Sequence, residues 1–236
     1  MLPEHFYFTG AGLLGYLLYV PVVVIGIGLL YGLLLRHIGA GVLRWGTTVT
    51  LAVTLLSLPF WDVLAIGYEA DKLCKEQGGL HVYKTVEAEG FYGSSGIKYW
   101  SKYGFRYVES GKTAKGISHW TLANGEVQHR YIPEPTSRYQ WKGAENHIQV
   151  AHQIERSSSH VIDRQTGEVL GDLVYFSIDP GWFDRLFLGL LPVEFNPWIC
   201  GDEVPADKRV KYGKRYGIIA LIKATLKPPS IGGNQS

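Results

Sequence analysis

The stretch AGLLGYLLYVPVVVIGIGLLYGLLL, residues 11–35, contains no Asp, Glu, His, Lys or Arg. About 20 apolar residues, at a rise of about 1.5 Å each, cross a hydrocarbon core of about 30 Å. The stretch therefore predicts a transmembrane helix. Glu4 and His5 precede it instead of Lys or Arg, and the apolar run is longer than the core of a signal peptide. We therefore expect the helix to remain as an anchor.

A second apolar run, TTVTLAVTLLSLPFWDVLAIGY, covers residues 47–68 and contains one charged residue, Asp62. Together the two runs predict a transmembrane helical hairpin over residues 1–69, with helices at about 11–35 and 47–68. We interpret Asp62 as a residue at the outer membrane interface, where aromatic residues such as the adjacent Trp61 are favoured.

The charges around the short connection predict the orientation of the hairpin. Arg36 and Arg44 flank this connection, whereas no Lys or Arg precedes the first helix. Because cytoplasmic loops carry an excess of Lys and Arg, we expect the connection in the cytoplasm and both termini on the other side. Lys72 and Lys75, just beyond the second helix, favour the opposite orientation.

Gly28 and Gly32 form a G-x-x-x-G pair in the first helix. Small residues at this spacing allow two helices to approach closely within lipid. The pair has two interpretations, packing against the second helix of the same hairpin or docking on a transmembrane helix of a partner protein.

The overall charge excludes one class of partner. The 236 residues include 23 Lys and Arg and 21 Asp and Glu, which gives a formal net charge of +2. Nucleic-acid binding requires a concentrated basic face, and here the basic residues are spread among nearly as many acids. We expect no nucleic-acid partner.

Beyond the hairpin the hydrophobic pattern changes to a period of two, which is typical of β-strands. Asn124 and Gly125 predict a hairpin turn, because both residues tolerate positive φ. Short turns between successive strands favour an antiparallel sheet. The predicted fold class is a membrane-anchored α+β chain, with a mostly antiparallel β domain over 70–228, one short helix, and a disordered tail at 229–236. Strands are predicted at residues 81–86, 118–123, 126–132, 147–156, 160–163, 169–178 and 217–226.

The short predicted helix begins near Asp179 and Pro180, which are typical of a cap and a first turn. The following apolar run, Trp182 to Leu191, is too short to span a bilayer. It either covers the open face of the sheet or lies in the membrane interface.

Cys74 and Cys200 are the two cysteines of the chain, and both belong to the domain that this topology exports. Disulfides persist in oxidising compartments, so the sequence predicts a bond between them. The alternative is a pair of buried free thiols.

The segment from Phe91 to Tyr107 is unusually rich in aromatic residues, interleaved with Lys98, Lys102 and Arg106. Aromatic and cationic side chains together are typical of protein interfaces. A groove for glycan or lipid and a simple contribution to the core remain open as alternatives. The candidate partner-binding residues are Tyr92, Tyr99, Trp100, Tyr103 and Phe105.

No catalytic or metal-binding arrangement emerges from the sequence. Residues 93–96, Gly-Ser-Ser-Gly, are one residue shorter than a nucleophile elbow. His147 and His152 are five apart on a predicted strand and point to opposite faces, so they cannot share a metal ion. We interpret His152 as a core histidine. We expect no cofactor, and we do not expect His119, His129 and His160 to converge on a metal ion.

The run from Cys74 to Val86, directly after the second helix, resembles the opening of uncharacterised bacterial envelope proteins in which a Cys, a Gly-Gly pair and a Val-Tyr strand follow the anchor. This resemblance implies a bacterial inner-membrane protein whose main domain and both termini lie in the periplasm.

The long anchor, the aromatic segment and the lack of catalytic signals favour an interaction or accessory subunit of an envelope complex, with the lipid bilayer and a membrane protein as partners. One alternative is an immunity-type membrane protein that binds a toxin. Another is a membrane-bound hydrolase of envelope glycan or lipid, with His129, His152 or His160 in its site.

Overall fold

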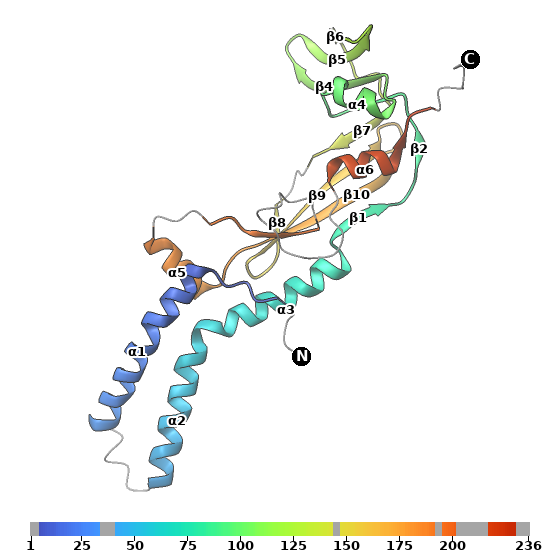
Figure 1. The fold of residues 1–236 in the computed structure, drawn as a ribbon. Coiled ribbons are helices and arrows are strands. Elements are labelled where there is room, and N and C mark those ends of the chain that lie inside the picture. Colours follow the sequence, from blue (N-terminus) through green and yellow to red (C-terminus); the bar gives the residue numbers. More distant parts are fainter. Residues whose placement is uncertain (1–4, 34–40, 144–146, 192–194, 202–216, 230–236) are drawn as a thin grey trace. The chain divides into compact units, whose positions relative to one another are not determined.

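The computed structural model describes residues 5–33, 41–143, 147–191, 195–201 and 217–229. The chain forms two compact units (Figure 1). The first combines residues 1–75, 149–155 and 177–198, and the second combines residues 76–148, 156–176 and 199–236. Arg36 and most of the predicted tail, residues 230–236, lie outside the described residues.

The predicted pair of long apolar helices is confirmed. Helix α1 covers Gly10–Leu33, and α2 covers Gly41–Ser57. The second helix continues through a short 3₁₀ segment, η2 (Leu58–Phe60), into α3 (Trp61–Glu76), and so begins earlier and ends later than predicted. Both helical runs are long and apolar enough to cross a membrane. The chain stays helical through Pro59 because this proline lies in the first turn of η2, where its fixed φ is tolerated.

Two tyrosines of α1 bind the end of α2, which runs beside it (Figure 1). Pro59 has no N–H to offer the carbonyl of Leu55 four residues earlier. The Tyr19 hydroxyl donates to this carbonyl at 3.0 Å, and the Tyr16 hydroxyl donates to the next one, on Leu56, at 3.4 Å. The Tyr19 hydroxyl thus satisfies the Leu55 carbonyl, which the proline would otherwise leave unpaired in an apolar setting.

Helix α5 (Trp182–Leu190) packs against the start of α1. The buried Asp184 side chain accepts a hydrogen bond from the Thr9 N–H at 2.6 Å and another from the Thr9 hydroxyl. Gly12 and Gly15 make this approach possible, because a Cβ at either position would collide with the side chains of Asp184 and Phe187. Coverage of the sheet by Trp182 to Leu191 is therefore wrong, since this helix lies on α1.

Asp62, which is predicted at the outer membrane interface, binds the start of α5. Its side chain is fully buried by protein, and Oδ2 accepts a hydrogen bond at 2.6 Å from the N–H of Trp182, the first residue of α5. The residue before α5, Gly181, has no side chain with which to cap the helix, so Asp62 supplies the acceptor from α3. The Nε2 atom of His152 lies 4.0 Å from the same oxygen.

The strand predicted over residues 147–156 is wrong. The segment folds as β8 (Ile148–Ala151), a turn at His152 and Gln153, and β9 (Ile154–Asp163). Gln153 has a φ of 61°, and the alternating pattern continues through the turn without revealing it. His152 is consequently not a core histidine, since its side chain is 57% exposed.

The main sheet has the strand order β1-β10-β9-β7-β3-β4-β5-β6, with β8 beside β9 and β11 beside β10. Strand β3 runs parallel to β4 and β7, whereas the pairs β1/β10, β4/β5, β5/β6 and β7/β9 are antiparallel. The mostly antiparallel prediction is confirmed. The bounds are β1 Gly79–Val82, β3 Gly90–Tyr92, β4 Tyr107–Thr113, β5 Gly116–Ala123, β6 Glu126–Ile132, β7 Tyr139–Lys142, β10 Val169–Ile178 and β11 Trp198–Cys200.

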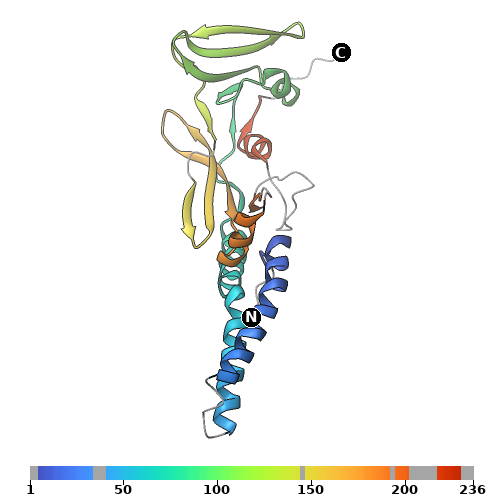
Figure 2. The same ribbon diagram turned by 90° about the vertical axis from the view of Figure 1, so that its left-hand side faces the viewer.

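Strands β5 and β6 form the hairpin that Asn124 and Gly125 predict. These residues have φ angles of 52° and 80°, as a type I′ turn requires. Figure 2 shows the green strands β4, β5 and β6 side by side. A smaller sheet pairs β2 (Val86–Glu87) with β12 (Leu226–Lys227) in parallel.

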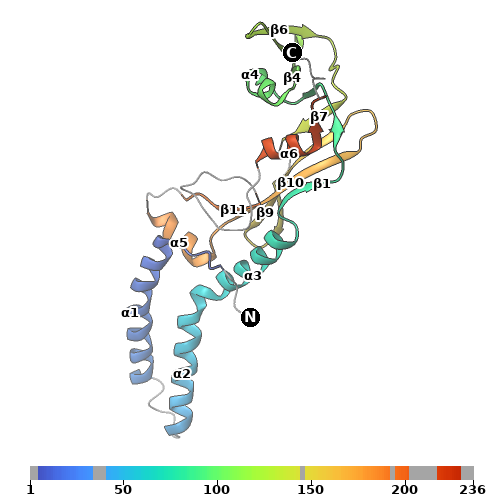
Figure 3. The same ribbon diagram turned by 45° about the vertical axis from the view of Figure 1, so that its right-hand side comes forward.

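The predicted last strand, residues 217–226, is wrong: Ile218–Thr225 forms helix α6, next to β10 and β1 (Figure 3). Leu221 and Ile222 are fully buried in the core, together with Leu173 of β10. A short apolar run does not distinguish a buried strand from a buried helix, and only the surface it covers decides between them.

The predicted disulfide between Cys74 and Cys200 is present. Cys74 lies in the last turns of α3, and Cys200 ends β11. The bond closes most of the β-rich part of the chain into one covalent loop.

Removal of this disulfide is expected to lower the free energy of unfolding by about 3 to 5 kcal/mol, because the crosslink restricts a very long loop in the unfolded chain. Denaturant unfolding of the detergent-solubilised protein, with and without reductant, measures this change. Cys74→Ser and Cys200→Ser serve as controls, and neither should respond to reductant. Strong thiol labelling of the denatured, unreduced wild-type protein would contradict the prediction.

Candidate functional site

The aromatic segment that the sequence singled out is mainly core. The rings of Phe91, Trp100 and Phe105 meet edge to face, with centroids 5.1 to 5.9 Å apart. Trp100 is 5% exposed and Phe105 is 2% exposed. The predicted partner-binding role of these two residues is therefore wrong in this structure, because their side chains are buried. The Trp100 indole donates to the Ser94 hydroxyl at 2.8 Å, which satisfies its buried N–H.

The tyrosines of the segment are less buried: Tyr99 is exposed, and Tyr92 and Tyr103 are half-buried. Tyr99 of α4 (Ile97–Trp100) is 38% exposed, and its hydroxyl lies 3.0 Å from that of Tyr103. The Lys223 ammonium lies 4.3 Å from the centre of the Tyr103 ring, and the Arg164 guanidinium lies 5.8 Å from that of Tyr92. The partner-binding role of these three tyrosines stays a prediction, and cationic groups of the same chain already contact two of the rings.

The open aromatic surface lies instead on the β5–β6 hairpin. The Trp120 and His129 rings stack with centroids 4.0 Å apart, and the His129 and Tyr131 rings meet edge to face at 4.7 Å. Val127 and Tyr131 are both 46% exposed. Sequence reasoning identified both strands and missed this surface, although the alternation of Val127, His129 and Tyr131 predicts that all three share one face.

The outer edge of β6, here called the β6 edge, is the second open feature of this hairpin. Residues 126–131 of β6 are all exposed. The inner edge of β6 pairs with β5. The pairing runs through seven consecutive residue pairs without a bulge, from Ile117↔Ile132 to Ala123↔Glu126. Within the described part of the chain no other strand pairs with β6. Its outward N–H and C=O groups therefore have no strand partner there.

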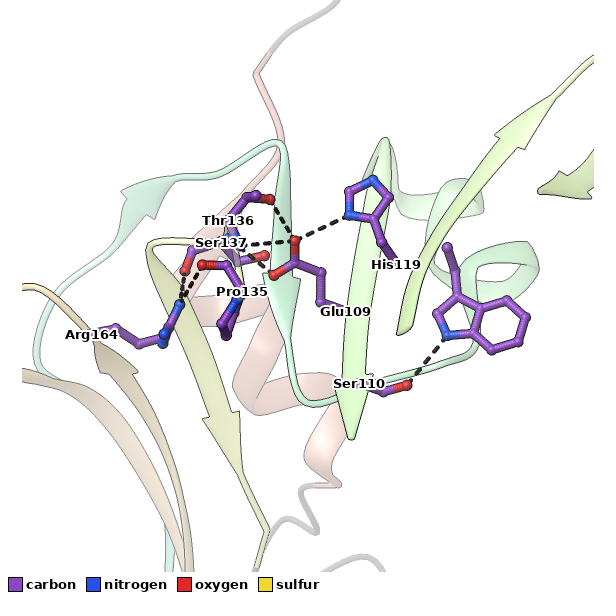
Figure 4. A network of polar contacts seen from close by, with 8 residues as sticks. Glu109, Ser110, His119, Pro135, Thr136, Ser137 and Arg164 are labelled. Carbon is purple, nitrogen blue, oxygen red and sulfur yellow. Dashed lines mark hydrogen bonds and ion pairs between the residues drawn. The ribbon is translucent and has the colours of Figure 1, made fainter. Parts of the chain in front are cut away.

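A buried carboxylate fixes the base of the hairpin (Figure 4). Glu109 of β4 is fully buried and accepts hydrogen bonds from the Thr136 N–H at 3.1 Å and the Ser137 N–H at 3.0 Å. The Thr136 hydroxyl donates to it at 2.5 Å. Nδ1 of His119, on β5, lies 3.1 Å from the same carboxylate, and the His119 ring stacks on Tyr107 at 5.0 Å.

These contacts determine the protonation of Glu109. Burial raises the pKa of its carboxyl, but the hydrogen bonds from Thr136, Ser137 and His119 outweigh this effect and lower the pKa below its ordinary value. The ionised form is therefore the stable one in the folded protein. Glu109 is an anchor for the segment that follows β6.

Two arginines complete the attachment of that segment. Arg164 donates to the carbonyls of Pro135 at 3.2 Å and Ser137 at 2.7 Å (Figure 4). Arg138 donates to Asp163 at 2.7 Å and 2.9 Å, and this interaction lowers the pKa of Asp163 to about 2. The chain leaving β6 is thus tied to β4 on one side and to the β9–β10 turn on the other.

The other histidines lie in separate environments. His160 contacts the Ser158 hydroxyl at 3.1 Å, and His147 contacts the Ser157 hydroxyl at 2.8 Å. Among the residues that the structure describes, no three His, Cys, Asp or Glu side chains are grouped to hold a metal ion.

A histidine–aspartate pair that sequence reasoning missed lies between β1 and β10. Nδ1 of His81 is 2.9 Å from Asp172, a residue 91 positions later in the chain. Burial and the Asp172 carboxylate raise the pKa of the neighbouring Tyr83 hydroxyl. A histidine oriented by a carboxylate is one component of a nucleophilic site. The Ser157 and Ser158 hydroxyls of β9 contact His147 and His160.

Gly28 and Gly32 lie on an open part of α1. A Cβ added at either glycine would meet no atom within 4 Å. Packing of this pair against the second helix of the same hairpin is therefore wrong for the described residues, and α1 contacts α2 through Tyr16, Tyr19 and Tyr31 instead.

Comparison with known proteins gives no relative: no protein-family model, curated protein or solved structure matches this chain.

Glu109→Gln is expected to lower the free energy of unfolding by about 2 kcal/mol at neutral pH, because the amide replaces one charged acceptor oxygen with an NH₂ group facing buried donors. Glu89→Gln is the matched control. Its exposed ion pair with Arg106 should contribute about 0.5 kcal/mol or less.

The pH dependence provides a second measurement. Because the pKa of Glu109 is lower in the folded state, its contribution is complete above the ordinary value of 4.5 and is lost as the pH falls through the folded pKa. Urea unfolding between about pH 3 and pH 7 should show wild-type stability falling more steeply below pH 4.5 than that of Glu109→Gln. Equal acid slopes would show that Glu109 is not the anchor described above.

Proposed function

We propose that this chain is a non-catalytic, membrane-anchored interaction subunit of a bacterial inner-membrane or envelope complex. The observation that carries the proposal is the outer surface of α1, which is apolar, exposed, and open at Gly28 and Gly32.

The exposed apolar surface supports membrane insertion. Soluble monomers rarely expose contiguous apolar patches of this extent. Helix α1 has 24 residues and is therefore about 36 Å long, enough to cross the hydrocarbon core. The α1 side chains that are more than half exposed include Leu13, Leu14, Leu17, Leu18, Val22, Val24, Ile25, Leu29 and Leu33.

The disulfide supports the periplasmic side for the β-rich part. Disulfides form in oxidising compartments and are rare in the bacterial cytoplasm. The bond between Cys74 and Cys200 therefore favours export of the chain between them. The basic residue Arg44 near the start of α2 favours a cytoplasmic connection, in agreement with the same orientation.

The open glycines favour a helix of another membrane protein as the partner. In lipid, helices associate through close packing and not through apolar burial, so small residues mark the contact. Because α2 does not occupy the Gly28 and Gly32 positions, a partner helix has access to them.

Gly28→Leu combined with Gly32→Leu is expected to reduce capture of the membrane partner at least about tenfold, because bulky side chains prevent close helix approach. The measurement is mass spectrometry of proteins that stay bound after mild detergent extraction and size exclusion from native membranes. Gly26→Leu is the control. Gly26 also has open space at its Cβ, but it lies about 200° around the helix from Gly28.

The control variant should retain the partner. Equal retention of a stoichiometric partner by the double variant would contradict the assigned docking face, and the absence of any membrane protein bound to wild type would contradict the proposed function.

A further inference from the structure

The β6 edge lacks the usual protections of an exposed strand edge. Natural edges carry proline, a bulge or several charges that prevent pairing with another strand. Strand β6 has no proline, its pairing with β5 has no bulge, and Glu126 and Arg130 are its charged residues. An edge of this kind is a template for one more strand.

The hydrogen-bonding groups that face outward follow from the turn. In a two-residue hairpin the residues that flank the turn, Ala123 and Glu126, exchange backbone hydrogen bonds. Alternation then directs the N–H and C=O groups of even-numbered residues of β6 toward β5. The backbone groups of Val127, His129 and Tyr131 point outward and are available to a second strand.

The charges of β6 match those of a second copy. When two β6 strands run antiparallel with Gln128 opposite Gln128, Glu126 of each copy lies opposite Arg130 of the other. Oppositely charged pairs across two strands stabilise the pairing, and this arrangement forms two of them. Among the described residues neither Glu126 nor Arg130 has an ion-pair partner in its own chain.

We propose that two copies of this chain pair through their β6 edges about a two-fold axis at Gln128. Val127 and His129 of the two copies are then the outward-bonded pairs, which gives four backbone hydrogen bonds across the axis. The proposal concerns a second copy and a surface of the β domain, and it does not depend on the proposed docking of α1.

The aromatic face of the hairpin favours the same register. Each Val127 side chain contacts the His129 ring of the other copy, which already stacks on Trp120. Each Tyr131 lies opposite Gly125 of the other copy, where the missing side chain leaves room for the ring. The side chains of Val127, His129 and Tyr131 from the two copies thus form one continuous face across the axis.

The neighbouring register is less favourable. With His129 on the axis, Glu126 lies opposite Ile132 and Arg130 lies opposite Gln128. Both ion pairs are lost, and two histidines face each other directly. The choice between the two registers is therefore open to experiment.

Oxidative cross-linking of single added cysteines in the full chain, solubilised in mild detergent, tests the register. Gln128 is a non-hydrogen-bonded pair on the axis, with Cα atoms about 4.5 Å apart, a distance that suits a disulfide. Gln128→Cys should give about tenfold more disulfide-linked dimer than Arg130→Cys, whose two Cα atoms are about 13 Å apart. Equal or reversed yields overturn the proposed axis.

Charge exchange tests the pairing itself. Glu126→Arg and Arg130→Glu should each convert the dimer to a monomer in light-scattering measurements, and the double variant should restore the dimer. Because both side chains are exposed, neither change disturbs the core. A wild-type chain that stays monomeric at micromolar concentration overturns the proposal and leaves the β6 edge to a strand of another protein. A double variant that stays monomeric overturns the proposed ion pairs between Glu126 of one copy and Arg130 of the other.

Discussion

Buried carboxylates that accept backbone N–H groups hold together the parts of this chain that regular secondary structure does not. Glu109 binds the N–H groups of Thr136 and Ser137, where the chain leaves β6. Asp184 binds the N–H of Thr9 at the start of α1, and Asp62 binds the first N–H of α5. A buried N–H without an acceptor is costly, and a charged acceptor forms the stronger hydrogen bond. Each carboxylate therefore determines the course of a segment far from it in sequence.

In the helical hairpin, too, a side chain from a distant segment pairs a polar backbone group that would otherwise lack a partner. Pro59 leaves the Leu55 carbonyl without its usual helical donor, and the Tyr19 hydroxyl of the neighbouring helix provides one. Side-chain packing at this end is aromatic: the Tyr16 and Phe60 rings meet at 4.6 Å, and the Tyr19 and Phe183 rings meet at 5.5 Å. At the other end of α1 the Tyr31 ring lies 6.5 Å from the Trp45 ring, but a Cβ at Gly28 or Gly32 would meet no atom within 4 Å. Function is therefore expected at the surface that intramolecular packing leaves open.

The aromatic residues show why composition alone did not locate the candidate site. Phe91, Trp100 and Phe105 are close in sequence to Tyr99 and Tyr103, yet the first three are buried and the tyrosines are not. Their segment contains a short helix, a 3₁₀ turn and a loop, so no single period predicts which side chains face the core. The β5–β6 hairpin has a clear period of two, but the sequence does not reveal which of its faces another element covers. Helix α4 packs on β5.

Local physics determined the apolar helix pair, the Asn124-Gly125 hairpin and the pairing of the only two cysteines, because helix length, turn conformation and the number of thiols are properties of short segments or of composition. Tertiary structure alone decided the rest. The run 218–225 forms a helix because it covers a sheet. The segment 147–156, predicted as one strand, is two strands because the chain reverses at His152 and Gln153. Glu109 became an anchor because its donors come from residues 136 and 137. These outcomes depend on contacts between distant residues, and no local pattern in the sequence encodes them.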